Sequence, residues 1–134
     1  MIDQLIKRFE SRKAVLGIIG LGYVGLPIVL ETTRTGYRTI GFDIDSKKVE
    51  SLQKGDSYIH HIPSTMIQQL VEGNLFEATT DYKRLAEVDA IIICVPTPLN
   101  KHREPDLGAV DATAEEVAKT LRPGQLVVLE STTY

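Results

Sequence analysis

Residues 17–27 read GIIGLGYVGLP, in which three glycines have the spacing G-x-G-x-x-G: Gly20, Gly22 and Gly25. The run before them, AVLGII at residues 14–19, is apolar throughout, a pattern typical of a parallel strand buried on both faces. Residues 23–35 then suit a helix, which Gly36 can end as a left-handed cap. The segment therefore predicts a strand, a tight turn and a helix.

The remainder of the chain continues this alternation. Strands are predicted at residues 38–44, 75–80, 89–98 and 125–130, and helices at residues 45–55, 65–73, 81–88 and 110–121. We expect the last strand, QLVVLE, to be buried, and the last helix to pack through one apolar face: Val110, Ala114, Val117, Ala118 and Leu121. Strands that alternate with helices imply a parallel sheet with right-handed crossovers. The predicted fold class is α/β, a Rossmann-type doubly wound parallel sheet in three layers, truncated after about the fifth strand.

Length and composition fit one ordinary globular domain of 134 residues, with 43% hydrophobic and 25% charged residues. The formal charge of −3 and the lack of a basic stripe argue against nucleic acid as a partner. No apolar segment is long enough to cross a bilayer, and the first residues do not resemble a signal peptide, so we expect no membrane association and a cytoplasmic location. Residues 1–13 are predicted to be an N-terminal helical extension and residues 14–134 one domain. Because the sequence stops after a strand, we expect a fragment of a longer enzyme.

The glycine motif has the context of a dinucleotide cradle, because it follows a strand and opens a helix. The three glycines would provide the tight turn, room for a pyrophosphate, and close packing of helix on strand. Asp43 follows 23 residues after Gly20, close to the separation expected for a carboxylate that binds the adenosine ribose. Such a carboxylate accepts hydrogen bonds from the ribose of NAD and repels the 2′-phosphate of NADP. Turn and packing roles for the glycines, and a strand-end role for Asp43, remain the alternatives, with Asp45 the better helix cap.

Three further motifs occur with this one in a fixed order: GFDIDSKKV, ICVPTPLNKHREPDL and VLESTTY. Together they resemble the N-terminal, NAD-binding domain of the UDP-glucose/GDP-mannose dehydrogenase family over residues 14–134. The resemblance implies an enzyme that oxidises the C6 alcohol of a nucleotide sugar to the uronic acid in two NAD-dependent steps, through an aldehyde-level intermediate held on a cysteine. The PTPLNKHREPDL and LESTTY segments look most like the branch acting on UDP-N-acetylglucosamine or UDP-N-acetylgalactosamine. UDP-glucose and GDP-mannose are the alternative substrates.

The resemblance implies a set of cofactor-binding residues: Gly20, Gly22, Tyr23, Val24, Gly25, Asp43, Lys48, Thr97 and Thr132. The backbone of residues 22–24 would meet the pyrophosphate, and Lys48 would reach the ribose region. Thr97 would form a wall beside the cofactor, and Thr132 would approach the nicotinamide. From the residues alone, Lys48 also fits an exposed helix lysine, Thr97 a rigid strand exit and Thr132 the cap of a turn.

No catalytic residue and no metal site is predicted in this chain. Cys94 lies inside the apolar run IIICV, so we assign it to core packing, and the family's nucleophilic cysteine is expected in a downstream domain. The fragment should therefore bind NAD without turnover, because the nucleotide-sugar substrate would be bound through the missing downstream domains. The resemblance implies a homodimer or larger assembly for the full-length enzyme. A non-catalytic NAD-sensing module and another Rossmann dehydrogenase, such as one for hydroxy acids, are the competing hypotheses.

Overall fold

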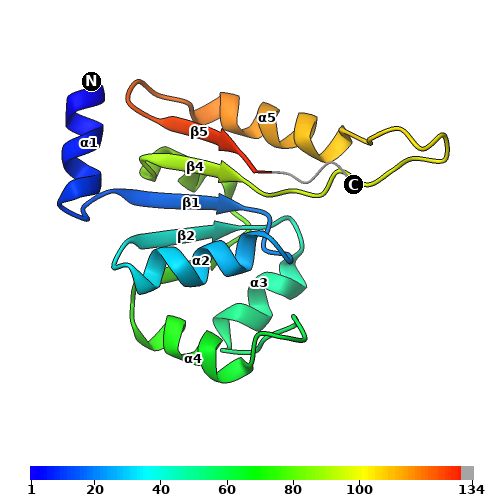
Figure 1. Ribbon diagram of the computed structural model, residues 1–134, viewed down its shortest axis with the longest axis horizontal. Helices are drawn as coiled ribbons and strands as arrows, with labels where there is room; N and C mark the ends of the chain where they lie inside the picture. Colours follow the sequence, from blue (N-terminus) through cyan, green and yellow to red (C-terminus); the bar gives the residue numbers. More distant parts are fainter. Residues whose placement is uncertain (131–134) are drawn as a thin grey trace.

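The computed structural model describes residues 1–130, in which five parallel strands form one sheet (Figure 1). The strands are β1 (Val15–Ile19), β2 (Arg38–Phe42), β3 (Phe76–Thr79), β4 (Ala90–Ile93) and β5 (Leu126–Leu129). Their order across the sheet is β3-β2-β1-β4-β5, so the chain runs from β1 to one edge and then returns to place β4 on the other side of β1. The predicted doubly wound α/β class is confirmed.

Helices cover both faces of this sheet and complete the three predicted layers. The helices on the faces are α2 (Gly25–Arg34), α3 (Ser46–Gln53), α4 (Ser64–Glu72), the 3₁₀ helix η1 (Tyr82–Glu87) and α5 (Gly108–Thr120), and a further helix, α1 (Ile2–Glu10), lies at one end of the sheet. One buried cluster joins the sheet to α2, α3 and α4, and a second joins it to η1 and α5. None of the helices in residues 1–130 is long and apolar enough to cross a membrane.

The central strand shows how the apolar runs build two cores. Successive side chains of a strand point to opposite faces of the sheet. Accordingly Ile18 belongs to the cluster with α2 and α3, while its neighbour Ile19 belongs to the cluster with η1 and α5, and both are fully buried. The continuous apolar pattern of residues 14–19 therefore reflects a strand that is covered on both sides.

The burial predicted for the last strand and the last helix is wrong. Three side chains of β5 are exposed to between 42 and 58%: Leu126, Val127 and Leu129. Among the described residues β5 pairs only with β4, so it forms an edge of the sheet and lacks a neighbour that would cover it. Hydrophobicity alone predicted burial here, but burial requires a covering element.

The apolar face predicted for α5 also differs from the face that packs. Val117 is buried and Val110 half-buried, but the other three predicted positions are exposed: Ala114, Ala118 and Leu121. The buried neighbour of Val117 is instead Thr113, whose hydroxyl donates to the Ala109 carbonyl oxygen at 2.7 Å. Because that hydrogen bond satisfies the hydroxyl within the helix, threonine can occupy the buried stripe.

The segment predicted as an 81–88 helix is a 3₁₀ helix of six residues, Tyr82–Glu87. The Asp81 carboxylate accepts from the Lys83 N–H at 3.1 Å and caps its start, and Val88 is already extended at its end. A 3₁₀ helix is usual in such short connections. It brings Tyr82 beside Phe42 at the end of β2, with ring centroids 5.7 Å apart.

The N-terminal extension docks through polar contacts at the amino end of the sheet (Figure 1). Asp89, which is buried just before β4, accepts hydrogen bonds from the Val15 N–H at 2.8 Å and from the Arg8 guanidinium at 3.0 Å. The Tyr37 hydroxyl donates to the Phe9 carbonyl oxygen at 2.6 Å. These contacts place α1 at the end of the sheet opposite the carboxyl ends of the strands.

We expect the Asp89→Ala substitution to lower the free energy of unfolding by about 2 kcal/mol, because it leaves the half-buried Val15 N–H without its acceptor and removes the ion pair with Arg8. Urea unfolding followed by circular dichroism measures the change. The matched control is Glu31→Ala, which removes an exposed ion pair with Arg34 and should leave stability nearly unchanged. Equal effects of the two substitutions would show that Asp89 does not hold the extension in place.

Cys94 is 8% exposed, directly after β4, which agrees with its predicted packing role. Burial, together with the charge of Glu130, raises the pKa of the thiol to about 11 from an ordinary value of 9.0. We therefore expect the folded chain at pH 8 to react with iodoacetamide about 100-fold more slowly than the guanidinium-unfolded chain, since two pKa units reduce the thiolate fraction by that factor. The same pKa difference makes the stability of the folded chain depend on pH. Because the thiol has the higher pKa in the folded chain, its contribution to stability is complete below pH 9 and is lost as the pH rises toward 11. Similar rates in the two states would contradict the burial.

Candidate dinucleotide-binding site

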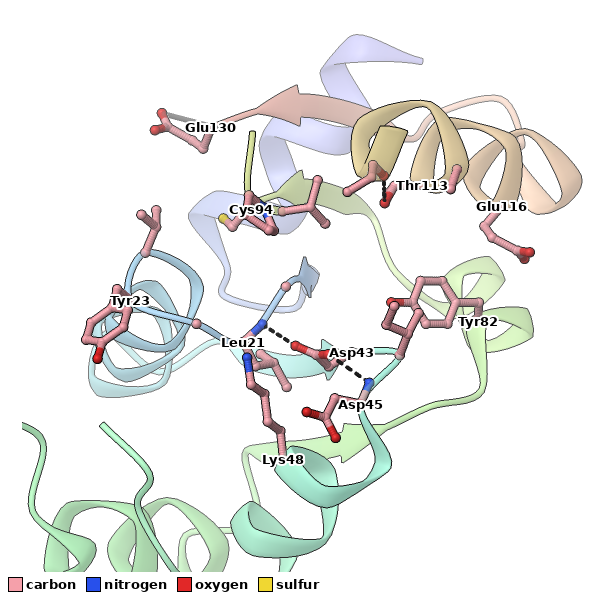
Figure 2. A pocket seen from close by; sticks show the side chains of 18 of the residues that line it. Leu21, Tyr23, Asp43, Asp45, Lys48, Tyr82, Cys94, Thr113, Glu116 and Glu130 are labelled. Carbon is pink, nitrogen blue, oxygen red and sulfur yellow. Dashed lines mark hydrogen bonds between the residues drawn. The ribbon is translucent and has the colours of Figure 1, made fainter. Parts of the chain in front are cut away.

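A cleft of about 740 Å³ opens at the carboxyl ends of β1, β2 and β4 (Figure 2). The turns that follow these three strands line it, together with one side of α5. The strand order reverses between β1 and β4, so the cleft lies at the topological switch point of the sheet. Ligands of open α/β sheets bind at this position.

Gly20 and Gly25 are required by the fold of the turn after β1. Gly20 has a φ of +95°, and a Cβ on it would lie 2.7 Å from the Cys94 carbonyl oxygen. A Cβ on Gly25 would lie 1.7 Å from the Gly20 carbonyl oxygen. Both contacts are with backbone atoms, which cannot move aside as a flexible side chain can.

Gly22 differs from its two neighbours in the motif. A Cβ on Gly22 would meet nothing within 4 Å, and its φ lies outside the left-handed region. The protein alone therefore has no steric need for glycine here. Since Gly22 lines the cleft, its missing side chain leaves room for a ligand to approach the backbone closely.

The backbone N–H groups of residues 22–24 supply an anion-binding surface. Within residues 1–130, no acceptor is recorded for the N–H groups of Gly22, Tyr23 and Val24. They lie at the start of α2, which has no side-chain cap. Free N–H groups and the positive end of the helix dipole together favour a phosphate group.

Asp43 joins the turn after β1 to the turn after β2. It is 8% exposed, and its carboxylate accepts from the Leu21 N–H and from the Asp45 N–H, each at 2.9 Å (Figure 2). An ionised carboxylate has about four acceptor positions, so positions remain for hydroxyl groups of a ligand. Asp45 caps α3 by accepting from the Lys47 N–H at 3.0 Å, which confirms its predicted capping role.

The structure brings most of the predicted site residues together. Six of them line the cleft: Gly20, Gly22, Tyr23, Val24, Asp43 and Lys48. Gly25 lies behind the cleft, packed against Gly20. Thr97 is 4% exposed and does not line the cleft, although the nearby Pro96 does. Thr132 lies outside the described residues.

Sequence reasoning missed the opposite wall of the cleft, formed by Tyr82 of η1 together with Thr113 and Glu116 of α5 (Figure 2). The pKa of the Tyr82 hydroxyl is raised by burial and by the charges of Asp43 and Glu116, so the hydroxyl stays protonated at neutral pH. No local pattern marks these residues, because only the packing of η1 and α5 on the sheet brings them to β2. The only signal that the sequence offered for this wall was the helix predicted after β4, the strand at the switch point.

The residues present fit a dinucleotide in three respects. The free N–H groups of residues 22–24 suit a pyrophosphate, and the open position at Gly22 lets it approach. The acceptor positions left on Asp43 suit a ribose diol. Among residues 1–130, no cluster of three or more His, Cys, Asp or Glu side chains is arranged to hold a metal ion.

Comparison with known proteins points to the same ligand. Residues 14–134 match the sequence profile of the UDP-glucose/GDP-mannose dehydrogenase family, NAD binding domain. The chain is 36% identical over 118 residues to the UDP-N-acetyl-D-mannosamine dehydrogenase of Salmonella typhi, over 87% of this chain and 27% of that protein. It is 35% identical over 126 residues to the UDP-N-acetyl-D-glucosamine 6-dehydrogenase of the same organism, over 94% of this chain and 29% of that protein.

Among solved structures, the GDP-mannose dehydrogenase from Pseudomonas aeruginosa has a TM-score of 0.83 and 31% sequence identity, over 87% of this chain and 28% of that protein. The chain thus spans under a third of the length of these relatives. The matched part includes the glycine turn, Asp43 and the strands that carry them. The chain therefore belongs to the UDP-glucose/GDP-mannose dehydrogenase family and carries its NAD-binding domain.

Proposed function

We propose that the cleft at the carboxyl ends of β1, β2 and β4 holds NAD for an enzyme that oxidises the C6 alcohol of a UDP-N-acetylhexosamine to a carboxylate. The observation that carries the cofactor assignment is the open position at Gly22, beside three N–H groups without an acceptor among the described residues. A turn that served only the fold would not need a glycine there.

Each part of the cleft has a separate task in this proposal. The N–H groups of residues 22–24 bind the pyrophosphate, and α2 adds its positive end. Asp43 accepts hydrogen bonds from the adenosine ribose, with Lys48 beside it. A buried carboxylate at this position disfavours a 2′-phosphate, so NAD is selected over NADP. Contact roles for Thr97 and Thr132 stay predictions.

The substrate class rests on the relatives rather than on the cleft. Two similar proteins are named for UDP-N-acetyl-D-mannosamine and UDP-N-acetyl-D-glucosamine, at nearly equal identity. The overall reaction converts one CH2OH group, one water and two NAD⁺ to one COO⁻ group, two NADH and three protons. Bound NAD would supply the hydride acceptor for this oxidation. The chain itself binds and orients the cofactor.

The reaction also needs a nucleophile for the aldehyde-level intermediate that the resemblance implies. Cys94 is unsuited because it is buried and its pKa is raised, so it stays a neutral thiol at neutral pH. We propose that the nucleophile and the sugar-nucleotide pocket belong to further domains of the enzyme. This chain alone would then hold NAD without oxidising a UDP-sugar.

The Gly22→Ala substitution tests the cofactor site. We expect it to weaken NAD binding about tenfold or more, because the new methyl group occupies the space through which the pyrophosphate approaches. Isothermal titration calorimetry measures the dissociation constant. Thermal unfolding should be nearly unchanged, since the methyl group meets no protein atom within 4 Å.

Gly73→Ala is the matched control, because Gly73 ends α4 with a φ of −72° and does not line the cleft. Its NAD affinity should equal that of the unchanged chain. Unaltered NAD binding in Gly22→Ala, with a folded protein, would remove the proposed site. Absence of NAD binding in the unchanged chain would remove the proposed function.

A further inference from the structure

The connection between α3 and α4 contacts the glycine turn at two points. The Tyr58 hydroxyl donates a hydrogen bond to the Leu21 carbonyl oxygen. The His61 ring stacks on the Tyr23 ring, with centroids 6.2 Å apart and an angle of 25° between the planes. A segment more than 30 residues away in the sequence therefore supports the residues of the proposed pyrophosphate site.

The protein core, rather than a ligand, fixes Tyr58 in this place. The next residue, Ile59, is 4% exposed, and Ile62 is 5% exposed. On the other side, the Ser57 N–H donates to the Ser64 hydroxyl at 3.0 Å, and the Ser57 hydroxyl donates to the Ile59 carbonyl oxygen at 3.1 Å. These contacts hold the backbone on both sides of Tyr58.

The hydrogen bond from Tyr58 sets the direction of a ligand-binding group. The Leu21 carbonyl and the Gly22 N–H belong to one trans peptide unit, so they point in opposite directions. The peptide unit on the other side of Leu21 is held by the Leu21 N–H, which donates to Asp43. With both units fixed, the Gly22 N–H is oriented before any ligand binds. Burial and the charges of Asp43 and Asp45 raise the pKa of Tyr58, so its hydroxyl remains a donor at neutral pH.

The ring of Tyr58 also contacts Lys48. The Lys48 ammonium lies 5.7 Å from the ring centroid, within the range of a cation–π interaction. In the described part of the chain, no carboxylate lies within ion-pair distance of Lys48. The Tyr58 ring is therefore the group that contacts the Lys48 ammonium. The Lys48 side chain extends from α3 toward the turn at Leu21 (Figure 2).

We propose that Tyr58 is a positioning residue for the dinucleotide site, whose hydroxyl orients the peptide of Gly22 and whose ring holds Lys48 at the cleft. Tyr58 does not line the 740 Å³ cleft; it lines an adjoining cavity of about 320 Å³ with Gly22, Tyr23 and Lys48. It therefore acts through these neighbours and not by touching the cofactor. The inference rests on the proposed function, because it says how NAD is held.

The test compares Tyr58→Phe with Tyr37→Phe by calorimetric titration of the chain with NAD. Each substitution removes one hydroxyl that donates to a backbone carbonyl, but Tyr37 bonds Phe9 at the far end of the sheet. We expect Tyr58→Phe to weaken NAD binding three- to tenfold, and Tyr37→Phe to leave it within twofold. Both substitutions should lower the thermal midpoint of unfolding by similar amounts. If Tyr58 only stabilised the fold, the two substitutions would therefore change NAD binding equally.

A double-mutant cycle tests the ring contact. We expect Tyr58→Leu and Lys48→Met each to weaken NAD binding. The loss of affinity in the double variant should be at least threefold smaller than the product of the two single losses. Effects that multiply fully would overturn the Lys48 part of the proposal. NAD affinity in Tyr58→Phe within twofold of the unchanged chain, or an equal loss in Tyr37→Phe, would overturn the hydroxyl part. If the unchanged chain does not bind NAD, the proposed function fails as well.

Discussion

The hydrogen bonds of the Asp43 carboxylate link the parts of this site. One oxygen accepts from Leu21 in the turn after β1, and the other accepts from Asp45 at the start of α3. The carboxylate thereby holds two turns that are more than 20 residues apart in the sequence. Because Asp43 is buried and charged, these bonds are stronger than those between neutral groups. The same group that orders the two turns also retains acceptor positions facing the cleft, which is the basis of the proposed choice of NAD.

The three glycines of one motif have different physical causes. Gly20 and Gly25 are required because a side chain would collide with backbone at 2.7 and 1.7 Å. Gly22 has open space around it and no strained backbone. A spacing of G-x-G-x-x-G cannot distinguish these cases, whereas the geometry separates them. Gly20 and Gly25 serve the tight turn, and the proposed cradle rests on Gly22, where the fold itself does not exclude a side chain.

Local signals predicted the fold class and the glycine turn, because apolar runs and glycines act on their immediate neighbours. Asp45 as the cap of α3 followed from the same kind of reasoning. Burial of β5 and the packing face of α5 were predicted wrongly, since each depends on which element covers it. Tyr58, Tyr82 and Glu116 could not be found from the sequence, because helices and connections distant in the chain bring them to the site. Within the family, the cytoplasmic location and the assembly of the full-length enzyme stay predictions.

The most direct test of the account is a calorimetric titration of the unchanged chain with NAD and, in parallel, with NADP. In the proposed site, a buried Asp43 carboxylate, already positioned by two backbone N–H groups, meets the adenosine ribose. We therefore expect NAD to bind at least about tenfold more tightly than NADP, with one site per chain. Equal affinities, or tighter binding of NADP, would contradict the proposed site. NADP could bind that well only if its 2′-phosphate lay away from the Asp43 carboxylate.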